Sequence, residues 1–145
     1  MPRRANDPFA SFNFMLEIDG ITQAGFSECT GLNAEANVID YREGSGESLN
    51  TRKLPGLLKY GNVTLKRGVT LNPELFKWFK NVQDGDILRD KTMSIVLLNE
   101  KRTEVVRYNL SNAWPCKFMG GDFKANANEI TIETVEICHE GMVRQ

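Results

Sequence analysis

The segment from residue 128 to residue 141 constrains the fold most, because its apolar residues change face partway along. Side chains of a β-strand alternate between two faces with a period of two. Ile130 and Ile132 therefore share one face, whereas Val135 and Ile137 share the other. Such a strand crosses a bulge, or it leaves its own core and joins a second packing surface. A partner subunit is one candidate for that surface, which makes Val135 and Ile137 predicted interface residues.

Most of the remaining chain also alternates between apolar and polar residues, as half-buried strands do. The run at 92–99 is apolar almost throughout, which is typical of a strand buried on both faces. Trp114 and Pro115 interrupt the ladder, since proline cannot donate a backbone hydrogen bond and favours edges or bulges. We expect strands at residues 12–18, 21–31, 34–42, 57–68, 92–99, 106–110, 112–118 and 128–141.

One segment, at about residues 73–83, has helical spacing instead. Asn72 suits the N-cap, Pro73 suits the first helical position, and Gly85 ends the pattern. The apolar residues that fall on one face of this helix are Leu75, Phe76, Phe79 and Val82. Together the patterns predict a mainly β fold, an antiparallel β-barrel or sandwich with one flanking α-helix.

A chain of 145 residues is one domain of ordinary size. Residues 1–10 read as a flexible N-terminal arm, which leaves a single domain over residues 11–145. Residues 43–56 form a long loop or a loosely held extended hairpin, with three glycines, a proline and charges of both signs. Long loops in compact domains are usually functional, so we expect this one to contact another molecule.

The formal net charge of −1 gives no support to nucleic-acid recognition, which usually comes with a basic excess. No apolar run approaches the roughly 20 residues that span a membrane, so we expect no membrane anchor. The polar N-terminus lacks a secretory signal, which predicts a protein kept in the cytosol or released by lysis or a non-classical route. Three cysteines without a close pair predict free, buried thiols.

Residues suited to catalysis or metal binding are sparse. His139 is the one histidine, and Cys138 beside it points to the opposite face of a strand. The paired spacing of zinc ligands and the spacing of a calcium loop are both missing, the latter around Asp84, Asp86 and Asp90. We therefore expect no catalytic residue, no cofactor and no metal.

Several ordered segments resemble the tail-tube proteins of contractile phage tails and of phage-like contractile injection systems. The resemblance runs from about residue 8 to the C-terminus. The segments that carry it are 12–14 (FNF), 17–20 (EIDG), 24–28 (AGFSE), 31–32 (GL), 41–44 (YREG), 52–56 (RKLPG), 62–69 (NVTLKRGV), 112–115 (NAWP) and 139–141 (HEG).

The resemblance implies a β-barrel or sandwich with one helix, shared with the haemolysin-coregulated-type tube proteins. It implies hexameric rings that stack into a rigid hollow tube, which a contracting sheath drives through a target envelope. The implied partners are the chain itself, the sheath, the baseplate and spike, and the tape-measure protein, with cargo in the lumen. It also implies no enzymatic activity, and assembly in the bacterial cytoplasm before incorporation into a phage tail or injection particle.

In this reading the loop at 43–56 reaches a neighbouring subunit or ring. Exposed charge pairs contribute only about 0–1 kcal/mol each, yet repeated around rings they can set register. The expected polar contacts are Glu43, Glu47, Arg52 and Lys53, and the expected apolar anchors are Leu54, Pro55 and Leu57.

Three other functions remain open at this point. A monomeric small-ligand-binding β-barrel would use the apolar run 93–98 and the aromatic residues to line a cavity. An enzyme would have to use His139. An oligonucleotide-binding barrel would need salt-sensitive binding to nucleic acid, against the charge balance.

Overall fold

The computed structural model describes residues 7–8, 13–18, 21–23, 26–47, 49–69, 71, 73–85, 93–126 and 129–145. Within these ranges, no helix has the length and apolar character needed to cross a membrane. The flexible N-terminal arm predicted at residues 1–10 lies outside them except for residues 7–8, and so do Asn72, Asp86 and Asp90.

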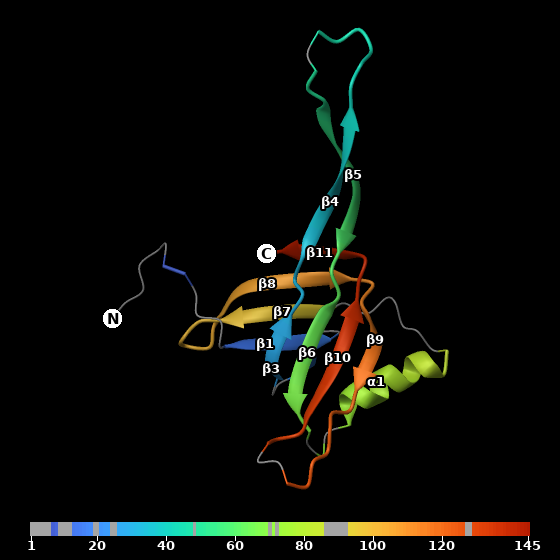
Figure 1. Cartoon of the computed structure of the whole chain (residues 1–145). Helices are drawn as coiled ribbons and strands as arrows, with labels where there is room; N and C mark the ends of the chain where they lie inside the picture. The colour runs from blue at the N-terminus through green and yellow to red at the C-terminus, as the bar shows by residue number, and fades with distance from the viewer. Residues whose placement is uncertain are drawn as a thin grey trace.

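The described strands form three antiparallel sheets (Figure 1). Sheet A has the order β11-β8-β7-β1-β2, sheet B the order β3-β6-β10-β9, and the third sheet pairs β4 with β5 alone. The strand bounds are β1 Phe14–Ile18, β2 Ile21–Gln23, β3 Phe26–Thr30, β4 Ala34–Tyr41, β5 Arg52–Tyr60, β6 Val63–Gly68, β7 Met93–Leu98, β8 Glu104–Ser111, β9 Trp114–Met119, β10 Ile132–Cys138 and β11 Gly141–Arg144.

Sheets A and B pack face to face, with their strands crossing, and the core lies between them (Figure 1). In β6, burial alternates strictly along the strand, as expected for a strand with one face on a core. The register places Val135 opposite Leu65 and Ile137 opposite Val63, and all four side chains are completely buried. A sandwich is thus confirmed, whereas the described strands do not close into a barrel.

Strand β7 confirms the prediction of burial on both faces. Five of its six residues are buried, and the sixth is partly buried. The one polar member, Ser94, has its hydroxyl 2.6 Å from the Asn109 side-chain oxygen on β8, which satisfies it inside the sheet. The apolar run therefore supplies core side chains to both faces of sheet A.

Helix α1 spans Glu74–Gln83, one residue later than predicted at its start, with Pro73 in the cap position. Leu75 is buried in the core between the sheets. Phe76 and Phe79 pack on Phe118 of β9, with ring centroids 5.5 and 6.3 Å apart. The helix thus lies against sheet B at the end of β9 (Figure 1).

Three predicted boundaries were wrong. The strand expected at 21–31 is two strands in different sheets, β2 and β3, and the strand expected at 57–68 is likewise divided between β5 and β6. At the second break the apolar residues change phase, from Leu58 and Tyr60 to Val63 and Leu65, and the prediction of one continuous strand overlooked this change. The predicted loop at 43–56 is shorter, because residues 52–56 already belong to β5. Pro55 is tolerated there because both strands of a two-stranded sheet are edges.

Candidate functional site

The most unusual part of the molecule is the hairpin arm, residues 34–60, which projects beyond the sandwich (Figure 1). Every described residue of β4 and most of β5 are exposed. An isolated two-stranded hairpin is only marginally stable in water. A hairpin of this length therefore points to a surface that packs on something else.

The hairpin arm also carries apolar side chains on both of its faces. In its distal half Ile39 pairs with Leu54, and the adjacent pair is Val38 with Pro55. Cross-strand partners share a face and successive residues alternate, so these two pairs lie on opposite faces. Large exposed apolar surface on a soluble protein marks an interaction site. The exposed large apolar residues of the hairpin arm are Val38, Ile39, Tyr41, Leu49, Leu54, Leu57 and Leu58.

Seven of the nine predicted interface residues lie together on the hairpin arm, all of them exposed: Glu43, Glu47, Arg52, Lys53, Leu54, Pro55 and Leu57. Among their polar contacts, the Lys53 ammonium lies 2.7 Å from Asp40 across the two strands. Within the turn, Arg42 donates to the Gly46 carbonyl at 3.3 Å.

The other two predicted interface residues, Val135 and Ile137, were placed wrongly. Both side chains have 0% exposure and belong to the core of the subunit. The apolar residues of the same segment that remain accessible are the earlier ones, Ile132 and Ile130, the latter 79% exposed. The irregularity between β10 and β9 lies at Glu136 and Ile137, with Cys116 of β9 as the extra residue, whereas β10 pairs with β6 without a shift. A bulge therefore does not explain the change of apolar face between Ile132 and Val135.

A second exposed apolar surface lies at the end of sheet B opposite the hairpin arm (Figure 1). It gathers where β6 and β9 end and where β10 and α1 begin. The sequence pattern indicated Ile130 and Ile132, but not the rest of this surface. We call it the basal patch, and its members are Val69, Leu71, Phe76, Met119, Phe123, Ile130 and Ile132.

Sheet B also contains a buried ion pair on its core face. Arg67 of β6 bonds Glu133 of β10, and both side chains are almost entirely buried. The Arg67 guanidinium also stands over the Phe26 ring, 5.9 Å from its centroid. Removing one partner of such a pair leaves an uncompensated buried charge. The pair therefore acts within the fold and is not presented to a ligand.

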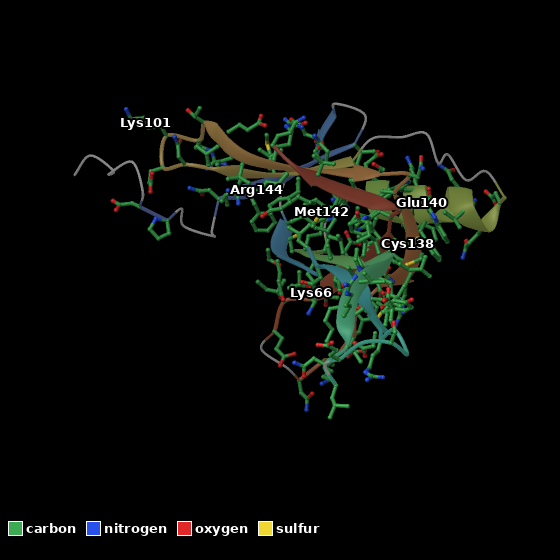
Figure 2. The ribbon with its side chains drawn as sticks, turned by 90° about the horizontal axis from the view of Figure 1, so that it is seen from above. Lys66, Lys101, Cys138, Glu140, Met142 and Arg144 are labelled. Atoms are coloured by element: carbon green, nitrogen blue, oxygen red, sulfur yellow. The ribbon has the colours of Figure 1, made fainter. Side chains whose placement is uncertain are left out.

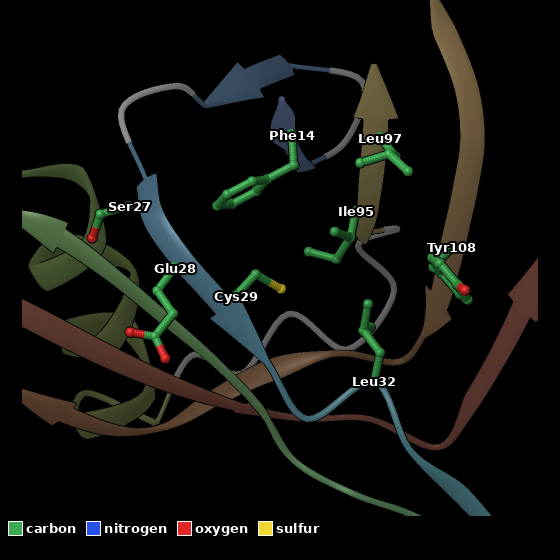
Figure 3. A pocket seen from close by; sticks show the side chains of 8 residues that line it. All are labelled: Phe14, Ser27, Glu28, Cys29, Leu32, Ile95, Leu97 and Tyr108. Atoms are coloured by element: carbon green, nitrogen blue, oxygen red, sulfur yellow. The ribbon is translucent and has the colours of Figure 1, made fainter. Parts of the chain in front are cut away.

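A cavity of about 390 Å³ opens between the two sheets (Figure 3). It is mainly apolar, and Cys29 lies in its wall, where burial raises the pKa of the thiol to about 11. A thiol that stays protonated at neutral pH is a poor nucleophile. The cavity is lined by Phe14, Ser27, Glu28, Cys29, Leu32, Ile95, Leu97 and Tyr108.

His139 is engaged with the backbone. Its Nδ1 lies 3.1 Å from the Gly141 carbonyl oxygen, and its Nε2 lies 3.1 Å from the Gly61 carbonyl oxygen. Burial is also the main cause that raises the pKa of Cys116 and of Cys138, the latter to about 11. Among the residues that the structure describes, no three histidine, cysteine or acidic side chains are grouped so as to hold a metal ion.

Solved structures similar to this chain come from contractile injection systems. A chain of the extended PVC sheath–tube complex, an extracellular contractile injection system, has 27% identity and a TM-score of 0.85, covering 97% of this chain and 93% of that one. A chain of the anti-feeding prophage cap, which terminates its tube, has 28% identity and a TM-score of 0.84, covering 100% and 95%.

A more distant structure, Hcp1 from Flavobacterium johnsoniae, shares the fold at 18% identity with a TM-score of 0.55, covering 92% of this chain and 94% of that one. No curated protein sequence matches the chain significantly. The model of the T4-like virus tail tube protein gp19 family matches residues 10–143, nearly the whole sequence. The chain, with its β-sandwich, single helix and projecting hairpin, therefore belongs to the T4-like virus tail tube protein gp19 family.

Proposed function

We propose that this chain is the inner-tube subunit of a contractile injection machine, and that six copies form each ring of a stacked, hollow tube. The observation that carries the assembly is the hairpin arm, whose apolar residues are exposed on both faces. Burying such surface stabilises an assembly by roughly 25 cal/mol per Å² of apolar area. The hairpin arm therefore becomes a stable element only when neighbouring subunits cover it.

The basal patch is the surface that we propose receives the hairpin arm of another copy. The two surfaces lie at opposite ends of the subunit (Figure 1), so both can be buried when copies stack head to tail. Repeated contacts between two different surfaces of one chain produce an open stack when the operation does not close. This geometry matches the stacking of rings along a tube axis.

The charged residues of the hairpin arm set the register of this contact in our proposal. Glu43, Glu47, Arg52 and Lys53 would make polar contacts that are individually weak at a surface. Leu54, Pro55 and Leu57 would supply the apolar anchoring. Such a division is common in interfaces, where buried apolar residues supply most of the affinity and a polar rim supports specificity.

Sheet edges offer the lateral contact within a ring. Strands β3 and β9 are the outer strands of sheet B, and each has one side that pairs with no other described strand. Exposed edges commonly add a strand from another chain. A ring of six copies is supported by a similar chain, at 28% identity, in the 6-fold symmetrised baseplate of the anti-feeding prophage.

The proposed partners are a sheath, a baseplate with its spike, and a tape-measure protein, with cargo carried in the lumen. Similar chains occur in a sheath–tube complex and in a baseplate, which supports the first two. We place assembly in the bacterial cytoplasm, followed by incorporation into a phage tail or an injection particle. We further propose that the chain has no enzymatic activity, which its membership of a structural family supports.

Negative-stain electron microscopy of the purified protein at increasing concentration tests this function. Rings or tubes with a central hole and sixfold averages are the expected result. A double variant, Leu54→Lys with Leu57→Lys, should give rings or monomers without tubes, because it places charge on the docking surface. Thr103→Lys adds charge at an exposed turn between β7 and β8 and should assemble normally.

A monomeric ligand-binding barrel is the second candidate, and the cavity between the sheets is the observation that favours it. Its volume falls within the roughly 300–1,000 Å³ of small-molecule sites. Monomers at every concentration, with and without a coexpressed baseplate, together with a bound apolar molecule detected by native mass spectrometry, would replace the tube function with this one.

A further inference from the structure

The root of the hairpin arm, Gly31, Asn33, Gly61 and Asn62 beside its two ends, is held more tightly than the arm itself. The Gly61 amide donates to the Asn33 carbonyl at 3.1 Å and so closes the base of the hairpin. Gly31 has a φ of +93°, and a Cβ there would lie only 2.0 Å from the Asn62 carbonyl oxygen. The backbone at the root is therefore packed too closely for any residue larger than glycine at position 31.

Two side chains from the C-terminal end of β10 contact this root. Glu136 accepts a hydrogen bond from the Asn62 side-chain amide at 2.8 Å. His139 directly follows β10, and its imidazole bridges two carbonyl oxygens: Gly61 in the root at 3.1 Å, and Gly141 at the start of β11 at 3.1 Å. Tyr60 is the last residue of β5, and its ring packs on the imidazole with the two ring centroids 5.5 Å apart.

The chemistry of this bridge constrains the protonation of His139. A carbonyl oxygen only accepts hydrogen bonds. A neutral imidazole has one N–H donor and one lone-pair nitrogen, whereas the imidazolium cation has two donors. With a carbonyl oxygen beside each ring nitrogen, the neutral ring leaves one lone pair facing an acceptor. Only the cation satisfies both contacts.

We propose that His139 is a positioning residue whose imidazolium form clamps the root of the hairpin arm to β11 and so fixes the direction in which the arm leaves the sandwich. The clamp itself depends only on the fold. Its consequence, that rings stack more readily when the clamp is closed, rests on the proposed function, because a misdirected arm cannot reach the next subunit.

Several other titratable groups lie on the segments next to the clamp, and of these Tyr60 contacts the ring. They are Tyr60 on β5, Glu136 and Cys138 on β10, Cys116 on β9, and Glu140, which accepts a hydrogen bond from Asn112 at 2.7 Å. Figure 2 shows Cys138 and Glu140 at the passage from β10 toward β11, on either side of position 139. Burial raises the pKa of both thiols, so they carry no charge beside the clamp at neutral pH.

The size of the effect follows from the contacts that the cation makes. Replacing His139 with an uncharged side chain removes the charge-assisted part of the clamp. Losing one charge-assisted hydrogen bond corresponds to a change of roughly tenfold in local opening. We therefore expect amides at the root to exchange about tenfold faster in His139→Gln than in wild type, relative to β7 amides.

The first measurement is ¹⁵N NMR of the imidazole, which distinguishes the cation from each neutral tautomer. The chain has a single histidine, so the assignment is unambiguous. The second is hydrogen exchange of the root amides, expressed as protection relative to β7 to remove the intrinsic pH dependence. Wild type is compared with His139→Gln, which keeps one donor nitrogen without the charge, and with the control Glu140→Gln, which removes a neighbouring charge.

The clamp is supported if NMR shows both ring nitrogens protonated under conditions in which the root amides are protected from hydrogen exchange. A roughly tenfold loss of root protection in His139→Gln at acidic pH and a wild-type profile in Glu140→Gln also support it. A neutral ring beside a protected root, or a His139→Gln profile equal to wild type, would overturn it. Electron microscopy of the same samples separates the two proposals, since absence of tubes with an intact clamp profile rejects only the tube function.

Discussion

Strands β5 and β6 follow one another with two residues between them, yet their surroundings differ completely. In β6 every second side chain is buried, and Leu65 has 0% exposure because β3 and β10 flank it and sheet A covers it. In β5, Leu57 is 75% exposed, since among the described strands only β4 pairs with β5. The local sequence favours a strand in both cases, but only β6 obtains its stability from within the subunit. We therefore infer that β5 gains its stability from a surface of another molecule.

The same contrast holds for charges. Arg67 and Glu133 form an ion pair inside the sandwich, whereas Lys53 and Asp40 form one on the exposed hairpin arm. Similar groups at similar separation thus have different consequences, because water screens the second pair and is excluded from the first.

The largest expected effect is on the free energy of unfolding, which should distinguish the buried ion pair from the exposed one. Arg67→Met leaves Glu133 buried without its partner, and we expect it to lower the free energy of unfolding by about 3–5 kcal/mol. Lys53→Met should change it by about 0–1 kcal/mol. Urea denaturation of the two variants measures both values. Equal losses would mean that the hairpin arm is as well packed as the sandwich.

The next comparison uses leucines on consecutive strands. Leu65→Ala should cost about 2–5 kcal/mol by opening a cavity in the core. Leu57→Ala should cost less than about 0.5 kcal/mol in the isolated subunit. In assembled tubes the order should reverse, and Leu57→Ala should weaken the contact between subunits more than Leu65→Ala does. The reason is that Leu57 would lie at that contact. Thermal unfolding measures the first pair of values, and dissociation of tubes in dilute solution measures the second.

Two glycine substitutions compare the root of the hairpin arm with its tip. Gly31→Ala forces a Cβ against the Asn62 carbonyl at a positive φ, and we expect a loss of at least about 1–3 kcal/mol. Gly44→Ala, in the turn, meets no atom within 4 Å and should be nearly neutral. Calorimetry measures the unfolding midpoint of each variant. Equal midpoints would contradict a tightly held root.

The smallest effect concerns the pH dependence of stability from Cys29. Burial raises the pKa of this thiol from 9.0 to about 11, so folding favours the neutral form. The contribution is complete below pH 9 and is lost as the pH rises through about 11. Cys29→Ala should reduce the loss of stability across that range by about 1–2 kcal/mol. Denaturation curves for both proteins at several alkaline pH values give the difference, and parallel pH profiles would exclude the contribution.

Sequence patterns were informative where a strand has one consistent environment. The apolar run of β7 and the helical spacing near Leu75 predicted those elements within about one residue. The strand expected at 12–18 contains β1, and alternation predicted where β6 ends but not where it begins. The prediction missed the change of sheets after β5, although the apolar residues change phase across Gly61 and Asn62.

The predicted interface residues likewise fall into an exposed set and a buried set. Unusual composition identified seven exposed residues of the hairpin arm, since glycine, proline and mixed charges are readable without coordinates. The apolar pairs of the C-terminal segment are equivalent in sequence, and only the register with β6 shows that Val135 and Ile137 belong to the core while Ile130 stays exposed. The basal patch comes from segments far apart in sequence, so no local pattern could have revealed it.

The placement of the hairpin arm and the basal patch at opposite ends gives any stack of these subunits a polarity. One terminus of the polymer would display only free hairpins, and the other only bare basal surfaces. Growth could then be started by a protein that resembles one end of the subunit and stopped by a different protein that resembles the other. Two finished polymers facing each other with like ends could not join, so each would keep the length at which it was terminated.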